Sequence, residues 1–362
     1  MRIDLLEAEN FKSIKTARYS FSPAVNILWG DNAQGKTNTL EAMWLLTGVR
    51  SFRGGKENAF FRDGTENYRL FAAYTDNLRT CEIEIKAQKN ALKAIAANGV
   101  PLERASLLFG RLKAVLFTPE DLDLIKGSPE MRRSFLDLAV SQVKPGYAKV
   151  LVRYNRVLAQ RNAFLKDHFG DTSADTEAWD CQLAKTGAFI SVYRRFFCEK
   201  LKKSAEAFYY GISGGRDKLS LRFMPSAFSE LEIPGKVSPD FEEFYLKKLH
   251  SKLRDDLRQG FTSVGIHRDD IALSIDEKPA REFASQGQSR TGALALKLAE
   301  AENIFLGTGE MPVIMLDDVF SELDPMRRGF LIKQFEKNDA QVIITTASKP
   351  QYDGARVFEV KK

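Results

Sequence analysis

The sequence has few of the residues that form disulfide frameworks or metal clusters, and it lacks membrane spans. Its 362 residues include 3 Cys and 3 His. Cys81, Cys181 and Cys198 are odd in number and have no CxxC spacing, which is typical of reduced thiols. No apolar run reaches the roughly 18 residues of a membrane span, and the N-terminus has no secretory signal. These absences predict a soluble, cytoplasmic protein without a membrane partner.

The composition that is present favours a large core and a polyanionic partner. Hydrophobic residues make up 44% of the chain, enough for two lobes, and the formal net charge is +6 with a pI near 9.0. Residues 121–261 hold 24 Lys and Arg against 19 Asp and Glu, so this segment carries +5 of that +6. The positive charge is therefore concentrated in one part of the chain.

The most informative stretch is Gly30–Thr37, GDNAQGKT, which fits the GxxxxGKT phosphate-binding loop. Residues 25–29 before it predict a buried strand, and residues 38–46 after it predict a helix ended by Gly48. In this setting Lys36 can reach the β- and γ-phosphates of ATP, and the Thr37 hydroxyl can hold Mg²⁺. The alternative is a glycine-containing turn before a core helix. The predicted nucleotide-binding residues here are Gly30, Asp31, Asn32, Ala33, Gln34, Gly35, Lys36, Thr37 and Asn38.

Two consecutive carboxylates follow an apolar run near the C-terminus. Residues 313–316 predict a buried strand that delivers Asp317 and Asp318 to its carboxyl end. We expect Asp317 to hold Mg²⁺ opposite Thr37 and Asp318 to orient or deprotonate the attacking water, with Lys36 as the third catalytic residue. The alternative is an ordinary turn at the end of a strand, where Asp is common.

Ser285, Gln286 and Gly287 stand before a predicted helix. Its apolar positions recur at helical spacing and include Phe305, and Gly307 is the predicted end. Taken alone, Ser285 predicts the N-cap of a core helix. Together with the loop, the two aspartates and the SELD turn at 321–324, the segment resembles the signature motif of ATP-binding-cassette ATPases. That resemblance implies that Ser285 and the helix N-terminus touch the γ-phosphate held by a second subunit, in an ATP-bridged homodimer.

The remaining pattern predicts an α/β fold of this ATPase class. A mixed sheet flanked by helices and an antiparallel side sheet at 68–100 would form a head from residues 1–120 and 262–362. Residues 121–261 would form an inserted, mainly helical basic lobe. They show no sustained heptad repeat, so a long coiled coil is not expected.

Basic residues in this lobe leave two interpretations open. Arg132, Arg133, Arg153 and Arg156 recur at helical spacing and are candidates for DNA contact, but a solvated helix surface would have the same pattern. The interleaved aromatic residues Tyr154, Tyr193, Phe196 and Phe197 predict core positions rather than base-stacking platforms. Three consecutive residues cannot all face one ion, so the segment His267–Asp270 predicts structural and interfacial roles.

Five segments together resemble one family. They are GDNAQGKTNTLEA, FTPEDLDLIKGSPEMRR, HRDD, FASQGQSRT and LDDVFSELD, and in this order they resemble the bacterial RecF family of recombinational DNA repair over nearly the whole chain. Ile266 departs from the proline expected there. By resemblance Ser285, Gln286 and Gly287 contact nucleotide across the dimer. In the chromosome-maintenance branch of the cassette superfamily a basic residue at the place of Lys12 approaches the nucleotide, so Lys12 is also a candidate contact, and a surface lysine after a strand is the alternative.

The resemblance implies an ATP-dependent homodimer that closes on double-stranded DNA at gaps or single-strand to double-strand junctions. It implies RecR and RecO mediators as partners, indirect help to a RecA-type recombinase, and weak DNA-dependent ATP hydrolysis that releases DNA. Hydrolysis is expected to be slow, because Asp318 is one methylene shorter than the Glu of transporters. Two rival functions are a transporter-type ATPase subunit and a scaffold that uses nucleotide only to set its assembly state.

Overall fold

The computed structural model describes residues 1–171, 173–348 and 354–361, which fall into two compact units. Unit 1 comprises Met1–Asp121 and Lys297–Lys362, and unit 2 comprises Leu122–Leu296. The sequence predicted that residues 262–296 belong with the head, but in the structure they belong to unit 2. The reason is strand pairing, because β10 (Asp270–Ile275) is antiparallel to β9 (Leu219–Met224) of the lobe.

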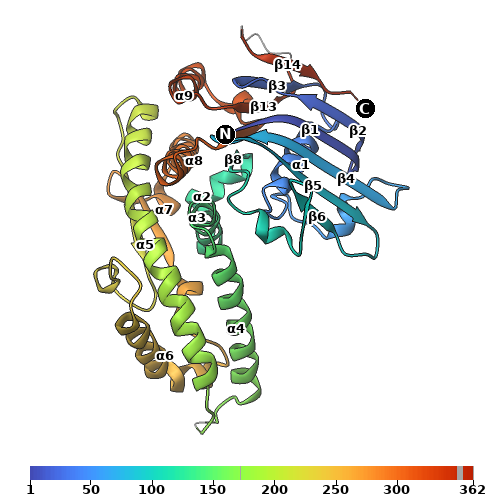
Figure 1. Ribbon diagram of the computed structural model, residues 1–362. Helices are drawn as coiled ribbons and strands as arrows, with labels where there is room; N and C mark the ends of the chain where they lie inside the picture. Colours follow the sequence, from blue (N-terminus) through green and yellow to red (C-terminus); the bar gives the residue numbers. More distant parts are fainter. Residues whose placement is uncertain (172, 349–353, 362) are drawn as a thin grey trace. The chain divides into compact units, whose positions relative to one another are not determined.

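A five-stranded parallel sheet forms the centre of unit 1 (Figure 1). Its order is β14 (Arg356–Glu359), β3 (Val25–Trp29), β13 (Val342–Thr346), β12 (Val313–Asp317) and β8 (Ala114–Phe117). Strands β3, β12 and β8 are short and almost entirely apolar, as expected when both faces of a sheet are covered, whereas the edge strand β14 is mostly exposed. Because all of them are parallel, the residues that follow β3, β12 and β13 meet at one edge.

A six-stranded antiparallel sheet forms the rest of unit 1. Its order is β2 (Ile14–Ser20), β1 (Arg2–Phe11), β4 (Asn67–Thr75), β5 (Thr80–Gln88), β6 (Ala94–Ala97) and β7 (Val100–Leu102). Helix α1 (Lys36–Leu46) contacts strands of both sheets and is buried along most of its length. The predicted side sheet is thus confirmed, and α1 links it to the parallel sheet.

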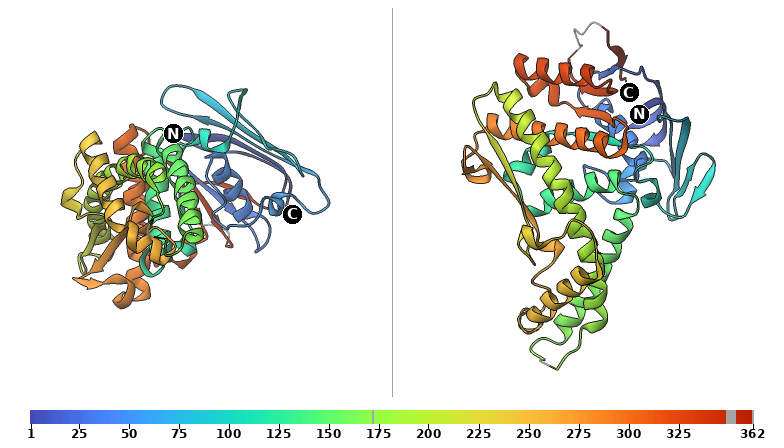
Figure 2. Two further views of the ribbon diagram at one scale, coloured as in Figure 1. Left: turned by 90° about the horizontal axis from the view of Figure 1, so that it is seen from below. Right: turned by 60° about the vertical axis from the view of Figure 1, so that its left-hand side comes forward.

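Unit 2 is mainly helical (Figure 2). Its helices are α2 (Asp123–Lys126), α3 (Pro129–Val143), α4 (Tyr147–Asp167), α5 (Glu177–Ser213), α6 (Pro239–Gln259), α7 (Ala280–Phe283) and the first part of α8 (Gln286–Thr308). Strand β11 (Lys278–Pro279) extends the β9 and β10 pair. Helix α5, with 37 residues, is the longest in the described part of the chain, so that part contains no long coiled coil.

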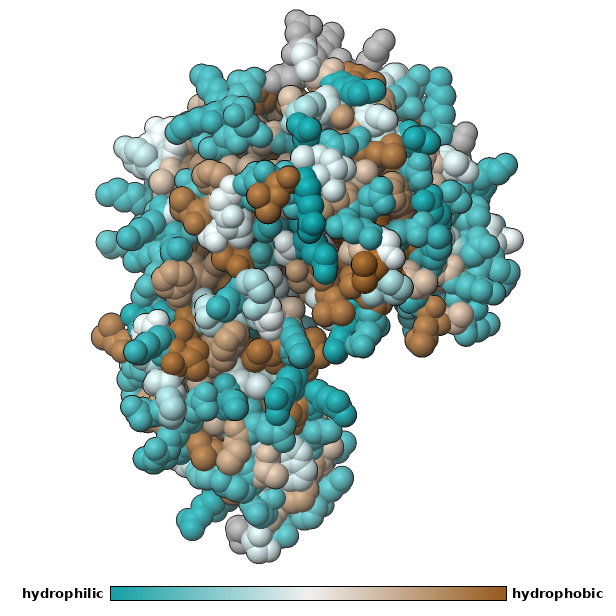
Figure 3. Space-filling view, in the orientation of Figure 1, coloured by the Kyte–Doolittle hydropathy of each residue, from teal (hydrophilic) through white to brown (hydrophobic). Residues whose placement is uncertain are grey.

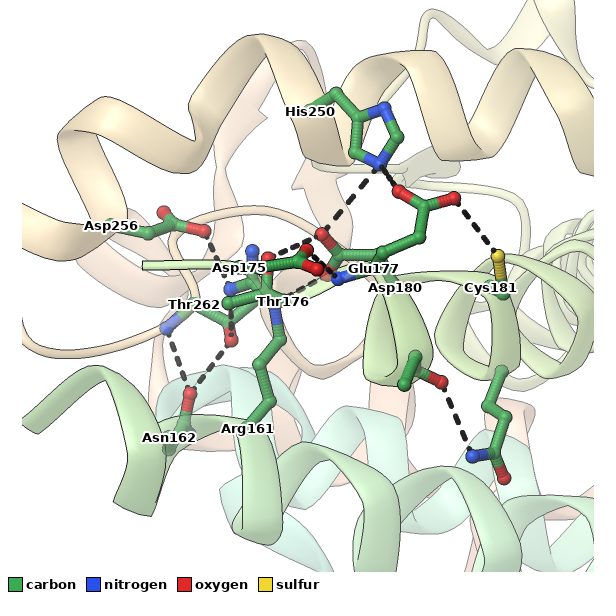
Figure 4. Close-up of polar contacts among 12 residues, drawn as sticks. Arg161, Asn162, Asp175, Thr176, Glu177, Asp180, Cys181, His250, Asp256 and Thr262 are labelled. Carbon is green, nitrogen blue, oxygen red and sulfur yellow. Dashed lines mark hydrogen bonds and ion pairs between the residues drawn. The ribbon is translucent and has the colours of Figure 1, made fainter. Parts of the chain in front are cut away.

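Buried ion pairs join the helices of unit 2 (Figure 4). Arg161 on α4 is fully buried; its Nε donates to Asp180 Oδ1 of α5 at 2.6 Å and its Nη1 donates to Asp256 Oδ2 of α6 at 2.7 Å. Arg194 of α5 is likewise buried and pairs with Asp137 of α3. The spacing of these arginines in the sequence is the same as that of exposed arginines. In the structure they hold the lobe together.

Short 3-10 turns connect several of the helices and strands. The turns span Glu57–Phe60, Ala105–Leu108, Pro119–Leu122, Glu230–Glu232, Ile266–Arg268 and Val319–Glu322. Helix α8 ends at Thr308 rather than at the predicted Gly307, because Gly309 adopts the left-handed conformation with φ 72°. In the described residues no helix combines the length and apolar character that crossing a bilayer requires.

Candidate nucleotide-binding site

The loop Gly30–Thr37 connects β3 to α1, as the sequence predicted. Gly30 has φ 155°, and a Cβ there would lie 2.6 Å from the carbonyl oxygen of Val360, so this position requires glycine. Gly35 has φ 106° immediately before α1. The Lys36 ammonium is buried and donates to the carbonyl oxygens of Gly30 at 2.7 Å and Asp31 at 2.8 Å. The loop is therefore wound around the lysine, with Asp31, Asn32 and Ala33 exposed at its mouth.

Asp317 lies at the carboxyl end of β12, opposite Thr37. The Thr37 hydroxyl donates to Asp317 Oδ1 at 2.9 Å, and the Thr345 hydroxyl at the end of β13 donates to the same oxygen at 2.8 Å. Burial raises the pKa of the Asp317 carboxyl, and the hydrogen bonds from Thr345 and Thr37 oppose that rise. A hydroxyl and a carboxylate in contact are hard oxygen ligands of the kind Mg²⁺ prefers, so the pair fits the predicted metal site.

Asp318 differs from its neighbour in exposure and backbone. It is exposed and has φ 54°, and its N–H donates to the Thr345 hydroxyl at 3.0 Å. Strand β12 ends at Asp317, and the left-handed φ of Asp318 turns the backbone out of the strand direction. The two carboxylates thus have distinct environments, one buried and hydrogen-bonded and one open to solvent.

The turn between β1 and β2 lies against the loop. Asn38 Nδ2 donates to Ser13 Oγ at 2.7 Å, and Lys12 Nζ lies 2.5 Å from Glu41 Oε2 of α1. A cavity of about 660 Å³ opens beside this turn. Its lining includes Lys12, Gln34, Tyr19 and Arg62.

Lys12 therefore lies next to the phosphate-binding loop. It is not a free surface lysine, because its ammonium pairs with the buried carboxylate of Glu41. The residues of β2 and Arg62 that complete the cavity were missed by sequence reasoning. Strand β2 alternates like an ordinary sheet edge and Arg62 lies outside the strands, so no local signal separates these residues from other exposed polar positions.

Ser285 is the N-cap of α8, as predicted. The Gln288 N–H donates to Ser285 Oγ at 3.1 Å, and the Ser285 N–H donates to Gln288 Oε1 at 3.0 Å, which forms a capping box. Ser285 and Gln286 are exposed, and Gly287 is half-buried. The 23-residue helix thus presents its N-terminus to solvent, where an anion could approach. This motif belongs to unit 2, whereas the phosphate-binding loop belongs to unit 1.

The four arginine candidates for DNA contact separate into two pairs. Arg132 is buried, and its Nε and Nη2 donate to the two carboxylate oxygens of Asp270 at 2.7 and 2.9 Å, so its prediction as a DNA contact is wrong. Arg133 Nη1 donates to the carbonyl oxygen of Asp269 at 2.8 Å, which also occupies it within the lobe. Arg153 and Arg156 are exposed on α4 and stay candidates.

The HRDD segment has the structural role that the sequence predicted. His267 Nε2 donates to the Thr262 carbonyl oxygen at 3.0 Å, and its Nδ1 lies 2.9 Å from the Tyr154 hydroxyl. Asp269 pairs with Arg194 and Asp270 with Arg132. None of the His, Cys, Asp and Glu side chains in the described ranges gathers into a metal-holding group of three or more.

Comparisons with known proteins agree with this geometry. Residues 2–361 match the family described as RecF/RecN/SMC N terminal domain. A DNA replication and repair protein RecF of Agathobacter rectalis is 37% identical over 369 residues, which cover 100% of this chain and 98% of the relative. The chain belongs to the RecF family. A RecF of Clostridioides difficile is also 37% identical, over 363 residues that cover 100% of this chain and 95% of that one.

Solved structures share the fold of this chain. A structure of the recombination mediator protein RecF-ATPrS in the RecFOR pathway has a TM-score of 0.90 at 35% identity, covering 99% of this chain and 95% of that one. An Smc head domain from Pyrococcus furiosus has a TM-score of 0.54 at 18% identity, which is a likeness of fold alone. The predicted α/β ATPase head with an inserted helical lobe is confirmed. Membership of a DNA replication and repair family also argues against the transporter-subunit alternative.

Proposed function

We propose that this RecF-family chain binds Mg-ATP and closes as a homodimer on DNA in recombinational repair in the cytoplasm. The observation that carries the proposal is the hydrogen bond between Thr37 and Asp317, because it joins the phosphate-binding loop to the strand-end carboxylate. The related RecF structure named for its ATP analogue supports the nucleotide. In this proposal residues 30–38 surround the phosphates, and Thr37 and Asp317 hold Mg²⁺, which supplies charge neutralisation at the phosphates.

The cavity beside the loop is suited to the rest of the nucleotide. Its lining includes the cations of Lys12, Lys15, Arg18, Arg62 and Lys361 and the half-buried ring of Tyr19. The wall is mainly polar, with Ile14, Tyr19 and Val360 among its apolar members, and convergent polar groups fix the orientation of a ligand. We therefore assign the base and ribose to this cavity and the phosphates to the loop, with Lys12 at the boundary between them.

Dimer closure depends on the exposed N-terminus of α8. Ser285, Gln286 and Gly287 of one protomer would contact the γ-phosphate that the other protomer holds, so ATP would join the two chains. The capping box supports this role, since it fixes Ser285 at a helix N-terminus that is open to solvent and favours an anion. Closure would then follow from the higher affinity of ATP for the closed state.

Hydrolysis in this proposal opens the dimer slowly and is stimulated weakly by DNA. Asp318 is exposed and sits beside the buried Asp317, so it is placed to orient or deprotonate water, with Lys36 on the phosphates. We expect Asp318→Asn to keep ATP and trap the closed dimer, and Lys36→Arg to weaken closure or turnover. Double-stranded and gapped DNA would be the ligand, RecR and RecO the mediators, and a RecA-type recombinase the indirect beneficiary at single-strand to double-strand junctions.

The experiment is binding to a fluorescent gapped duplex with and without Mg-ATP, for the unchanged chain and for Ser285→Arg. We expect ATP to tighten binding and Ser285→Arg to abolish that gain. Ser251→Arg, an exposed serine on α6, is the matched control for the added charge. The measurement is paired with the oligomeric state by light scattering.

If DNA affinity changes neither with ATP nor with Ser285→Arg, the dimer does not close on DNA as proposed. The scaffold alternative predicts a different pattern, namely intact DNA binding and nucleotide-dependent assembly without ATP turnover. Phosphate release with and without DNA distinguishes the two, since the proposed ATPase turns over slowly and the scaffold does not.

A further inference from the structure

One face of α5 carries aromatic residues and lysines at helical spacing. We call it the α5 stripe, and it consists of Phe189, Tyr193, Phe196, Lys200, Lys203 and Tyr210. Successive members are separated by 4, 3, 4, 3 and 7 residues. Because a helix turns once in about 3.6 residues, all six side chains project from the same side. The stripe extends over roughly 30 Å at about 1.5 Å per residue.

The stripe is distinct from the core face of α5. The rings of Phe197 and Tyr209 are buried, as are Leu183 and Leu201, and these residues bind α5 to its neighbours. Phe196 is 52% exposed and Tyr210 is 54% exposed. The prediction that Phe196 and Phe197 both lie in the core is therefore right for Phe197 and wrong for Phe196. Packing within unit 2 does not account for the exposed rings.

Lysines lie directly against the rings of the stripe. Lys200 Nζ lies 4.5 Å from the ring centroid of Phe196, and Lys144 Nζ lies 4.8 Å from that of Tyr193. The Phe189 and Tyr193 centroids are 4.7 Å apart. Ala207 lies on the same face between Lys203 and Tyr210, and two carboxylates lie at its margin, Glu199, which is paired with Arg195 at 3.1 Å, and Glu206. Over the middle of α5, the surface in Figure 3 mixes hydrophobic and hydrophilic groups.

This chemistry matches an unpaired nucleic acid strand. Exposed rings stack on any base, and ammonium groups beside them reach the phosphates on either side of that base. A duplex keeps its bases stacked inside and would leave the rings unused. A hydrophobic partner helix would use the rings but would have to desolvate Lys200 and Lys203 without an opposite charge.

We propose that the α5 stripe binds single-stranded DNA. The bases stack on Phe196 and Tyr210, and Lys144, Lys200 and Lys203 contact the phosphates. This inference rests on the proposed function, because that function makes DNA the nucleic acid. It assigns the unpaired strand of a gap to the α5 stripe. It requires neither ATP nor dimer closure, because every group of the stripe belongs to one helix and Lys144 lies beside it.

The test measures binding of fluorescein-labelled oligo(dT) to the full chain by anisotropy, without nucleotide. The pair Phe196→Leu with Tyr210→Leu should weaken binding about tenfold or more, because stacking is lost while apolar character is kept. The pair Lys200→Gln with Lys203→Gln should reduce the slope of log affinity against log salt by about 0.7 for each lysine. In a Phe196→Trp variant, oligo(dT) should quench the fluorescence of the new indole.

Matched controls lie elsewhere in unit 2. Phe169→Leu changes a ring that is 67% exposed, and Lys247→Gln changes an exposed lysine of α6, and both should leave oligo(dT) binding unchanged. Equal affinity in the stripe and control variants, or an indole signal at position 196 that oligo(dT) does not quench, overturns the proposal and favours a protein partner for this face. ATP-dependent binding of the gapped duplex, tested with Ser285→Arg, does not depend on the result with oligo(dT). It tests the proposed function alone.

Discussion

The Thr37 hydroxyl donates a hydrogen bond of 2.9 Å to Asp317 Oδ1, although 280 residues separate the two in the chain. The contact arises because β3 and β12 both flank β13 in a parallel sheet, so their carboxyl ends face the same edge. Thr345, at the end of β13 between them, donates to the same oxygen. One carboxylate thus joins the loop after β3 to the ends of β12 and β13.

Asp317→Asn should separate stability from nucleotide binding. The folded state raises the pKa of Asp317, so the buried carboxylate costs stability as pH rises through that pKa, and the cost is absent at pH values below the ordinary Asp pKa near 4. The Asn Oδ1 can still accept from Thr37 and Thr345. We expect a higher Tm without nucleotide at pH 7, a smaller gain near pH 4, and strongly weakened Mg-ATP binding.

Thermal unfolding and a fluorescent ATP analogue measure the two effects of Asp317→Asn. Asp318→Asn is the control, because its side chain is exposed and the substitution should change the free energy of unfolding by less than about 0.5 kcal/mol. A lower Tm for Asp317→Asn at pH 7 would contradict the idea that this carboxylate is held at a cost.

Arg161→Leu should destabilise unit 2 severely. The substitution leaves Asp180 and Asp256 buried without the guanidinium that joins them, and removing one partner of a buried pair costs about 3–5 kcal/mol. Urea unfolding monitored by Trp179 fluorescence measures the loss. Arg156→Leu, on the exposed side of the same helix, should change stability by no more than about 0.5 kcal/mol.

The same substitution, Arg to Gln, should affect stability at Arg132 and DNA binding at Arg153. Arg132→Gln breaks the two hydrogen bonds to Asp270 and should lower stability by about 3 kcal/mol. Arg153→Gln combined with Arg156→Gln should keep stability and lower the salt slope of duplex binding by about 0.9 for each phosphate that these arginines neutralise. Unfolding curves and duplex titrations at several salt concentrations measure the pair. Unchanged duplex binding in the double variant would remove α4 from the DNA-binding surface.

His267 should make the fold sensitive to mild acid. Burial lowers the pKa of His267 to about 4, and the charges of Arg268 and Arg133 add to the effect. Between about pH 6.5 and 4 the unfolded chain therefore binds a proton at His267 and the folded chain does not. Stability should therefore be complete above pH 6.5 and fall between about pH 6.5 and 4, by a total on the order of 3 kcal/mol. Urea midpoints across this range measure it. His267→Gln should flatten that slope, and an equally steep profile would assign it to other groups.

Local patterns predicted the elements that form the nucleotide site. The GxxxxGKT spacing with its apolar strand and following helix describes a loop whose geometry depends on a few adjacent residues, and the structure has β3, the loop and α1 in that order. Ser285 likewise predicts a helix N-cap, and its hydrogen bonds with Gln288 confirm it. Such features are encoded locally, because glycines, caps and apolar periodicity act within a few residues.

The sequence by itself determined the phosphate-binding loop, the two strand-end carboxylates and the start of α8. The tertiary structure alone decided which arginines of one helical pattern are buried, since Arg161 meets Asp180 and Asp256 whereas Arg156 meets solvent. It also decided that Phe197 is buried and Phe196 is exposed. Adjacent residues of a helix point in directions about 100° apart, so the side that faces the core depends on which helices and strands pack against it.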